Sequence, residues 1–445
     1  MRLFFYVTSS IVFAFSMSRT LGGETQVLPS AATSDEIFCV ARLELDELDP
    51  KALRAAAQAV IHSQWSSIAP MLLKYELMRR KLSGLGVRTV VQATATPEVA
   101  AFSDKDVVLF GIRGDERPDG VKLIEACFGA YEIDRWTAKQ DANWITMYHR
   151  DQAPDFGGQP DEHSNRIHHA LKMLGKRPGV VLVPTTEIQK MLDAQAAEMQ
   201  ANLPPSVFKV LNLLRTAPSV TVAVKIDAQP AMKLIVQMQS EKHAQQLVAD
   251  WEAMTPDFIA LLKGIPKLPS GTPELKQPPP GLRLLALMPN LKLVQQGSQV
   301  AAVVDTKTTA QVVDCTLLAR MRVMREVLGE NKHPIDQLMA LKTWLENYQL
   351  MHDSLPDSLD ELKAILSESP KEQEAEFKWL MTNPYTDEFP AFRYEKPAMD
   401  TEDNQGSRER IAMIEELKDG KPFLQNARVY ADGHLEIGAV KIRGV

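Results

Sequence analysis

The feature that most constrains the fold is an order of strand and helix patterns that runs twice between residues 36 and 315. In "EIFCVARLEL", residues 36–45, every second side chain is apolar, which is typical of a strand. A helical stretch, two strands, a short helix, two further strands and the helix "DEHSNRIHHALKMLG" follow. We predict that Asp161 caps this last helix and that Gly175 ends it.

The second pass begins at "GVVLVPT" and continues with a long helix over residues 186–202 and a shorter one in "LPPSVFKVLNLLRTA". Two strands, another helix, two strands and a helix from Thr308 complete it. No residue motif repeats between the passes, so the order of elements alone supports a duplication. The sequence therefore predicts an α+β fold with two related units, 36–177 and 178–315, each a mostly antiparallel sheet with helices on one face.

Proline and glycine predict where the helices and loops of these units end. We expect the helical stretch from Pro50 to break at Pro70 and to end at Gly84 and Gly86. We expect a second interruption near Pro256. The stretch "GIPKLPSGTPELKQPPPG", residues 264–281, predicts an exposed loop.

The N-terminus predicts export. "MRLFFYVTSSIVFAFSMSRTLGG" has one early cation, a short apolar run and small residues after it, which is the pattern of a secretory signal peptide over residues 1–23. The alternative is an uncleaved anchor, although the run is shorter than the roughly 20 apolar residues of a membrane span. Residues 24–35 are then expected to be a flexible lead-in, and the mature protein to be periplasmic or secreted.

Charge and cysteine content limit the function classes. The net charge is −7 with no Lys/Arg block, which argues against nucleic acid as a partner. Cys39, Cys127 and Cys315 are widely spaced, so the chain has no Cys/His cluster at zinc spacing. Either one disulfide and one thiol or three buried thiols fit this spacing.

The last third predicts a separate module, 316–445. Apolar residues recur at helical spacing in "TLLARMRVMREVL" and again from Leu338 to Tyr348. Asp353 to Pro356 should break the second helix, and Ser358 or Asp357 can cap the short helix "LDELKAIL".

This module resembles the globular part of type II secretion major pseudopilins and the pilin-like C-terminal modules of exported planctomycete-type bacterial proteins. The resemblance covers about a quarter of the chain, and residues 1–300 resemble, more faintly, uncharacterised exported proteins of the same bacteria. The matching residues are Tyr348, Leu355, Pro356, Leu359, Leu362, Asn383, Pro384, Tyr385, Phe392, Tyr394, Ala431, Asp432 and Gly433. The resemblance implies a small helix-and-sheet fold.

One departure from the pilin pattern bears on function. The helical stretch that precedes the matching residues carries Arg320, Arg322 and Arg325, and each arginine at a bilayer centre costs roughly 2.5–3.5 kcal/mol. We therefore expect it to pack on protein, which leaves the module without the hydrophobic stem of a fibre subunit. Some pseudopilins bind calcium near the last strands; Asp387, Glu388 and Asp432 lie in comparable places here, but a fuller ligand set is lacking and solvated turn carboxylates are the alternative.

Few residues point to catalysis. His163, His168 and His169 follow Asp161, but His163 and His168 are five positions apart and do not share a helix face as metal ligands would. His149 stands beside Arg150 and Asp151 at a strand end, as a site residue or as an exposed one. Trp136, Trp144 and Tyr148 form either an aromatic binding face or sheet core. These candidates are His149, Arg150, Asp151, Asp161, His163, His168, His169, Trp136, Trp144 and Tyr148.

The sequence has no GxSxG, HEXXH or phosphate-binding glycine motif. We therefore expect no catalytic, metal or cofactor site. The favoured interpretation is an exported, non-enzymatic envelope protein with a structural, adhesive or protein-recognition role, whose partner is another envelope or secreted protein. The alternatives are an enzyme with a polar site assembled between the two units and a peripheral secretion-system component.

Overall fold

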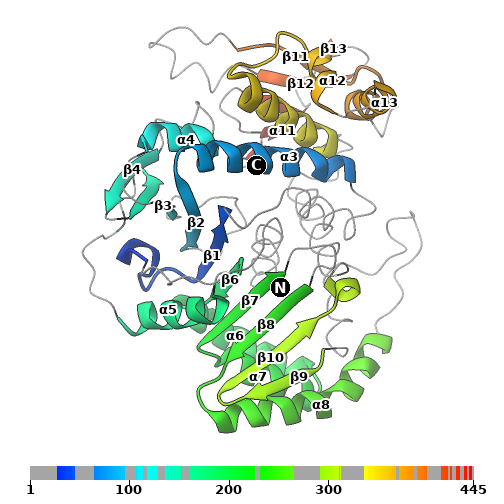
Figure 1. The fold of residues 1–445 in the computed structure, drawn as a ribbon. Helices are drawn as coiled ribbons and strands as arrows, with labels where there is room; N and C mark the ends of the chain where they lie inside the picture. Colours follow the sequence, from blue (N-terminus) through cyan, green and yellow to red (C-terminus); the bar gives the residue numbers. More distant parts are fainter. Residues whose placement is uncertain are drawn as a thin grey trace.

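The computed structural model describes most of the chain between residues 28 and 442. The described residues are 28–45, 65–95, 107–113, 118–128, 136–141, 143–151, 154, 161–175, 177–225, 231–264, 291–309, 311, 335–366, 370–383, 388–397, 412–418, 421–422, 427–430, 435–437 and 440–442. They form a large antiparallel sheet with helices packed on it, and a smaller helix-and-sheet module beside it (Figure 1). The α+β class that the sequence predicts is confirmed.

Ten strands make the large sheet. They are β1 (Cys39–Glu44), β2 (Val87–Thr94), β3 (Val107–Ile112), β4 (Trp136–Asp141), β5 (Trp144–His149), β6 (Gly179–Leu182), β7 (Ser219–Lys225), β8 (Ala231–Gln237), β9 (Leu293–Gln296) and β10 (Gln299–Val304). Their order is β4-β5-β3-β2-β1-β6-β7-β8-β10-β9. From the centre of the sheet outward, the strands of the first half follow the order β1-β2-β3-β5-β4 and those of the second half the order β6-β7-β8-β10-β9. In both halves the last two strands are exchanged in the same way, as a duplicated unit would have them.

The two units share one sheet because β1 and β6 pair antiparallel at its centre, with Cys39 opposite Leu182 and Arg42 opposite Gly179. This central position also determines how β1 is buried. The strand predicted from the alternation in residues 36–45 is present as β1, and all six of its residues are buried, Arg42 and Glu44 included. A strand in the middle of a covered sheet has no solvent face.

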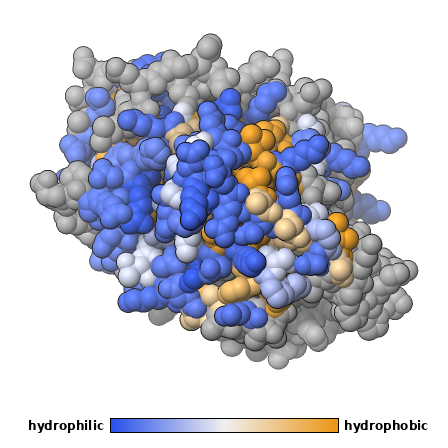
Figure 2. Space-filling view, turned by 90° about the horizontal axis from the view of Figure 1, so that it is seen from below, coloured by the Kyte–Doolittle hydropathy of each residue, from blue (hydrophilic) through white to orange (hydrophobic). Residues whose placement is uncertain are grey.

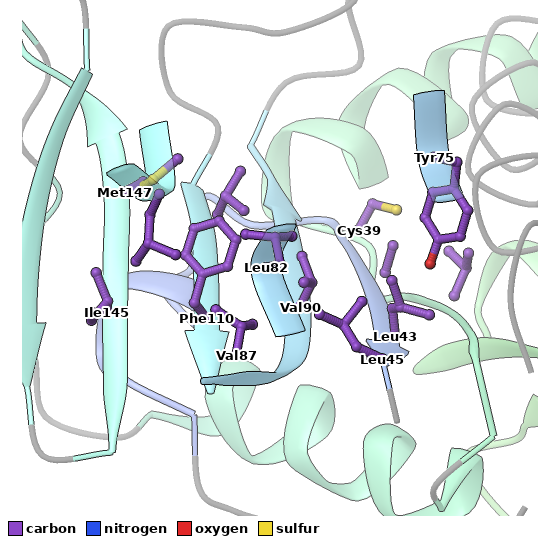
Figure 3. Close-up of a cluster of buried hydrophobic side chains, with 14 of the residues drawn as sticks. Cys39, Leu43, Leu45, Tyr75, Leu82, Val87, Val90, Phe110, Ile145 and Met147 are labelled. Carbon is purple, nitrogen blue, oxygen red and sulfur yellow. The ribbon is translucent and has the colours of Figure 1, made fainter. Parts of the chain in front are cut away.

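Five of the helices pack on one face of the sheet. They are α3 (Trp65–Gly84), α4 (Gly120–Phe128), α6 (Thr186–Asn202), α7 (Pro205–Arg215) and α8 (Glu241–Gly264). Leu82 of α3 meets the strand residues Val90 and Phe110 in the core beneath α3, α4 and α6 (Figure 3). A neighbouring core joins α7 and α8 to Val236 and Val300. The prediction of helices on one face holds for these five.

α5 (Glu162–Leu174) lies on the opposite face, where Ile167 and Leu171 pack on Val181 and Ala223. Its ends are as predicted. The Asp161 carboxylate accepts a 2.7 Å hydrogen bond from the Ser164 N–H, and the helix stops at Gly175, whose φ is +64°. Such a left-handed residue is a common helix terminator.

Both predicted proline breaks are wrong. α3 continues through Pro70, and α8 continues through Pro256. In α8 the missing N–H of Pro256 removes one helical hydrogen bond, but Trp251 and Met254 of the same turns are buried in the core. We attribute the uninterrupted helix to this tertiary packing, which outweighs the local cost.

The flexible lead-in predicted for residues 24–35 is also wrong in its described part. A short 3-10 helix, η1 (Ser30–Ala32), stands there, and Leu28, Ala31 and Ala32 are buried against the sheet face that carries α5. Small apolar side chains allow this segment to lie close to the strands, so it belongs to the core.

The C-terminal module has its own core. Its helices are α11 (Ile335–His352), η6 (Leu359–Leu362), α12 (Lys363–Leu366) and α13 (Pro370–Met381), and its strands are β11 (Phe392–Tyr394), β12 (Ala412–Lys418), β13 (Lys421–Pro422), β14 (Ala427–Tyr430), β15 (Leu435–Ile437) and β16 (Val440–Ile442). The predicted break follows α11, where Asp353 has a φ of +55°. Ser358 and Glu361 form the capping box of the next helix, which confirms the predicted cap.

α11 packs along α3 and joins the module to the large sheet (Figure 1). Lys74 pairs with Glu346, and Lys81 pairs with Asp353, so both pairs join residues 272 positions apart. Equal separation means that the two helices run parallel and in register, with ion pairs one heptad apart.

Several sequence predictions lie outside the described residues. These are the signal peptide 1–23, the helix start at Pro50, the loop over 265–281, Cys315 and the arginine-bearing segment 316–328. Cys39 and Cys127 are both thiols. Within the described ranges, no helix combines the length and apolar character that crossing a membrane requires.

Candidate functional site

Two of the three histidines of α5, His163 and His168, make hydrogen bonds to the backbone that support the fold. The buried His163 ring donates through Nε2 to the Ile37 carbonyl over 2.6 Å, and His168 Nδ1 lies 2.9 Å from the Ser164 carbonyl oxygen. His169 is exposed and Asp161 caps the helix. The three rings do not converge, and no group of three possible metal ligands occurs among the described residues.

His149 lies at the end of β5 with a loose carboxylate neighbour. Its Nδ1 is 3.9 Å from the Asp151 carboxylate, which is beyond a hydrogen bond, and Asp151 is exposed. The ring lies edge-on to Trp136, with 6.3 Å between the ring centroids. Arg150 is exposed in the same turn. This arrangement lacks the oriented acid–base pair that general catalysis uses.

The three aromatic residues do not form a common binding face. Trp136 is buried in the core on the side of α3 and α4, whereas Trp144 is buried on the side of α5. Trp136 pairs with His149 across β4 and β5, so these two side chains lie on the same side of the sheet. Tyr148 precedes His149 in β5 and therefore lies on the opposite side, which carries α5, where it is half-buried. The sheet-core alternative of the sequence analysis is therefore correct for Trp136 and Trp144.

Of the three possible calcium ligands, only Glu388 is among the described residues; Asp387 and Asp432 lie outside them. The Glu388 carbonyl accepts a hydrogen bond from the Asn383 N–H at 3.0 Å. Calcium therefore stays a prediction of the resemblance.

A polar cluster that sequence reasoning missed lies near the junction of the two units. Arg42 and Glu44 of β1 and Thr89 of β2 are all buried. One Glu44 oxygen accepts from the Arg42 guanidinium, and the other accepts from the Thr89 hydroxyl at 2.6 Å. Both oxygens are occupied, so this carboxylate is held as half of an ion pair and not as a base. The sequence "ARLE", residues 41–44, could have indicated this pair, because it places Arg42 and Glu44 two positions apart on one face of a strand.

Two further groups with acidic protons, the half-buried Cys127 and the buried Tyr75, are also inert. Burial raises the pKa of Cys127 to about 12, against a smaller lowering by the nearby Lys74 ammonium. Burial likewise raises the pKa of Tyr75 well above its ordinary value. Both groups are protonated at neutral pH and are poor nucleophiles.

The clearest surface feature is the outer face of β8, β10 and β9, on the side of the sheet that carries α5. Cross-strand pairing aligns Ile235, Ala301 and Val294 in one row and Lys233 with Val303 in the next. Burial falls along the first row, from buried Ile235 through half-buried Ala301 to Val294, which is 64% exposed; Val303 is 70% exposed. We call Val294, Ala301, Val303 and Lys233 the open face.

These two valines stand out on the described surface. Six large apolar residues are exposed among the described residues, and Val294 and Val303 are the two most exposed. They occupy diagonal positions on adjacent strands, a separation of about 7–8 Å. Seen from below, the coloured surface is mainly hydrophilic, with hydrophobic residues showing at a few places among the hydrophilic ones (Figure 2).

The open face adjoins an edge strand whose own four residues carry no charge. β9, the last strand, reads LVQQ, whereas the opposite edge strand, β4, ends in exposed Lys139 and Asp141. Charged residues on an edge strand discourage pairing with another chain. β4 has this protection and β9 lacks it.

The comparisons with known proteins give little. No family model matches the chain, and no curated protein matches it. A solved structure, crystal form I of TP0453, is similar with a TM-score of 0.25 and 10% identity over 66% of this chain and 99% of that chain. That score is too low for a fold or a function to be transferred.

Proposed function

We propose that this chain is an exported, non-enzymatic protein of the bacterial envelope that recognises another envelope or secreted protein through the open face. The exposure of Val294 and Val303 on adjacent strands is the observation that carries the proposal. Adjacent apolar side chains on a monomer surface mark an interaction site more often than scattered single ones. The signal-peptide pattern of residues 1–23 supports export.

The C-terminal module has a supporting role in this proposal. Residues of the pilin-like pattern gather in one core, which contains Leu355, Leu359, Leu362 and Phe392, with Tyr348 and Tyr394 packed against it. Tyr394 also donates to the Pro356 carbonyl at 2.8 Å. These contacts favour a pilin-like module that folds around its own core. Because α11 lies against α3, the module is expected to stay docked and not to swing on a linker.

The test is capture of partners from the envelope fraction by the full tagged chain. Val303→Asp should lose the partners that the unchanged protein retains, because a carboxylate replaces the exposed apolar surface. Val121→Asp is the matched control, since Val121 is also exposed but lies on α4. Full chains are needed because removal of residues 316–445 would uncover α3. Equal capture by Val303→Asp and the unchanged chain would contradict the proposal.

A further inference from the structure

We infer that the partner presents an extended acidic segment, which adds to the large sheet as a new strand beside β9. The inference rests on the proposed function, since it names the kind of segment that the open face receives. It draws on three independent features: the backbone at the edge, the apolar row behind it and the charge around it.

The first feature is the edge strand itself. Among the residues that the structure describes, β9 pairs with β10 alone, from Leu293 opposite Ala302 to Gln296 opposite Gln299. A strand with one partner has backbone N–H and C=O groups directed outward on its other side, which another extended chain can pair with. No side chain of β9 bears a charge that would discourage this.

The second feature decides which side chains such a segment needs. Val294 is on the open face and is followed across the sheet by Ala301 and Ile235. A strand that pairs with β9 places every second side chain on this face. An apolar side chain opposite Val294 would extend the row Ile235–Ala301–Val294 by one position and cover its exposed end.

The third feature is charge. Lys292 immediately precedes β9 and, on the register of the β9–β10 pair, stands in line with Val303 and Lys233. Lys292 is exposed, and neither lysine forms an ion pair with another described residue. The nearby Asp305 carboxylate accepts a hydrogen bond from the Thr308 N–H at 2.7 Å and forms no ion pair with either lysine. Two ammonium groups beside an apolar row favour carboxylates in the partner.

Together these features specify an alternating segment. The partner's apolar residue lies opposite Val294. The partner residue two positions away from it is on the same face and lies opposite Lys292, so it should be acidic. The simplest probe is the labelled peptide Thr-Glu-Thr-Val-Thr-Glu-Thr, in which Glu, Val and Glu share one face. Its counterpart with lysine in place of both glutamates tests the charge, and a version N-methylated at alternate amides tests the backbone pairing.

Fluorescence anisotropy of these peptides with the full chain is the experiment. We expect the acidic peptide to bind, and the lysine and N-methylated peptides to bind at least about tenfold more weakly. Lys292→Glu should reverse the preference between the acidic and lysine peptides. Lys139→Glu on the β4 edge is the matched control and should leave it unchanged.

The outcomes separate this inference from the proposed function. No binding of the acidic peptide, or equal binding of the N-methylated one, overturns strand addition even if Val303→Asp abolishes partner capture. If the Lys292→Glu variant binds the acidic peptide less tightly but does not bind the lysine peptide more tightly than the unchanged protein does, the acidic specificity is overturned. Sedimentation tests whether the chain associates with itself. If it does, and if Val294→Asp makes it monomeric, the edge binds a second copy of the chain and the inference is overturned.

Discussion

Lys74 of α3 and Glu346 of α11 lie 2.7 Å apart, nitrogen to oxygen, and connect the large sheet to the C-terminal module. Glu346 also pairs with Lys342 of its own helix at 2.8 Å, and Lys342 is buried. Burial by itself raises the pKa of Glu346, but the two ammonium groups outweigh it and lower the pKa to about 2. One carboxylate therefore balances two cations at this helix contact.

Glu346→Gln should destabilise the protein by about 1–3 kcal/mol, because the buried Lys342 and its neighbour Lys74 then both lose the carboxylate with which they pair. The Glu346 side chain is 30% exposed, which keeps the expected loss below that of a fully buried pair. Urea denaturation followed by tryptophan fluorescence measures the change; Trp344, buried on α11, is a natural reporter. Glu162→Gln is the control, because Glu162 is 87% exposed and pairs with Arg166 at the surface. This change should alter stability by less than about 0.5 kcal/mol.

The same carboxylate predicts a pH dependence. Its folded pKa, about 2, is below the ordinary 4.5, so the unfolded chain binds a proton more readily between these values. Stability from this group is complete above about pH 5 and is lost as the pH falls toward 2, by at most about 3 kcal/mol. The free energy of unfolding measured from pH 6 to pH 2.5 should therefore fall less in Glu346→Gln than in the unchanged protein. Parallel pH profiles for the two would contradict the assignment.

Gly179→Ala should cost more than about 2 kcal/mol. A Cβ at this position would stand 2.2 Å from the Val222 carbonyl oxygen and 2.4 Å from Leu174 of α5, and the backbone contact cannot relax easily. Gly84→Ala at the end of α3 is the matched control, because a Cβ there meets nothing within 4 Å. That change should be neutral or stabilising by up to about 1 kcal/mol. Thermal unfolding of both variants decides; equal melting temperatures would refute the close contact.

Cys127 should react very slowly with iodoacetamide in the native protein at pH 8. With a pKa near 12, about one thiol in ten thousand is ionised at that pH. Mass spectrometry of the peptide that contains Cys127 measures the modification, and the urea-unfolded chain is the control, in which alkylation should be rapid. Rapid modification of the native protein would show that the thiol is not shielded as the structure has it.

Local sequence patterns predicted the elements well where the signal is local. The caps at Asp161 and Ser358, the stops at Gly175 and Asp353, and the strand and helix order of both units follow from backbone preferences that a few neighbouring residues determine. The proline breaks failed because the burial of Trp251 and other distant contacts decide whether a helix continues. Of the open face, sequence reasoning identified the strands but not the exposure of Val294 and Val303.

The sequence by itself determined which residues alternate, which helices are amphipathic and where turns begin, because these depend on the chain's own geometry over a few residues. Only the tertiary structure decided that β1 pairs with β6 to make one sheet, that α5 takes the other face and that α11 lies along α3. A periodic pattern states which side of an element avoids water, and it does not state what covers that side. The Arg42–Glu44 pair is buried and Val303 is exposed because of where their strands lie in the sheet.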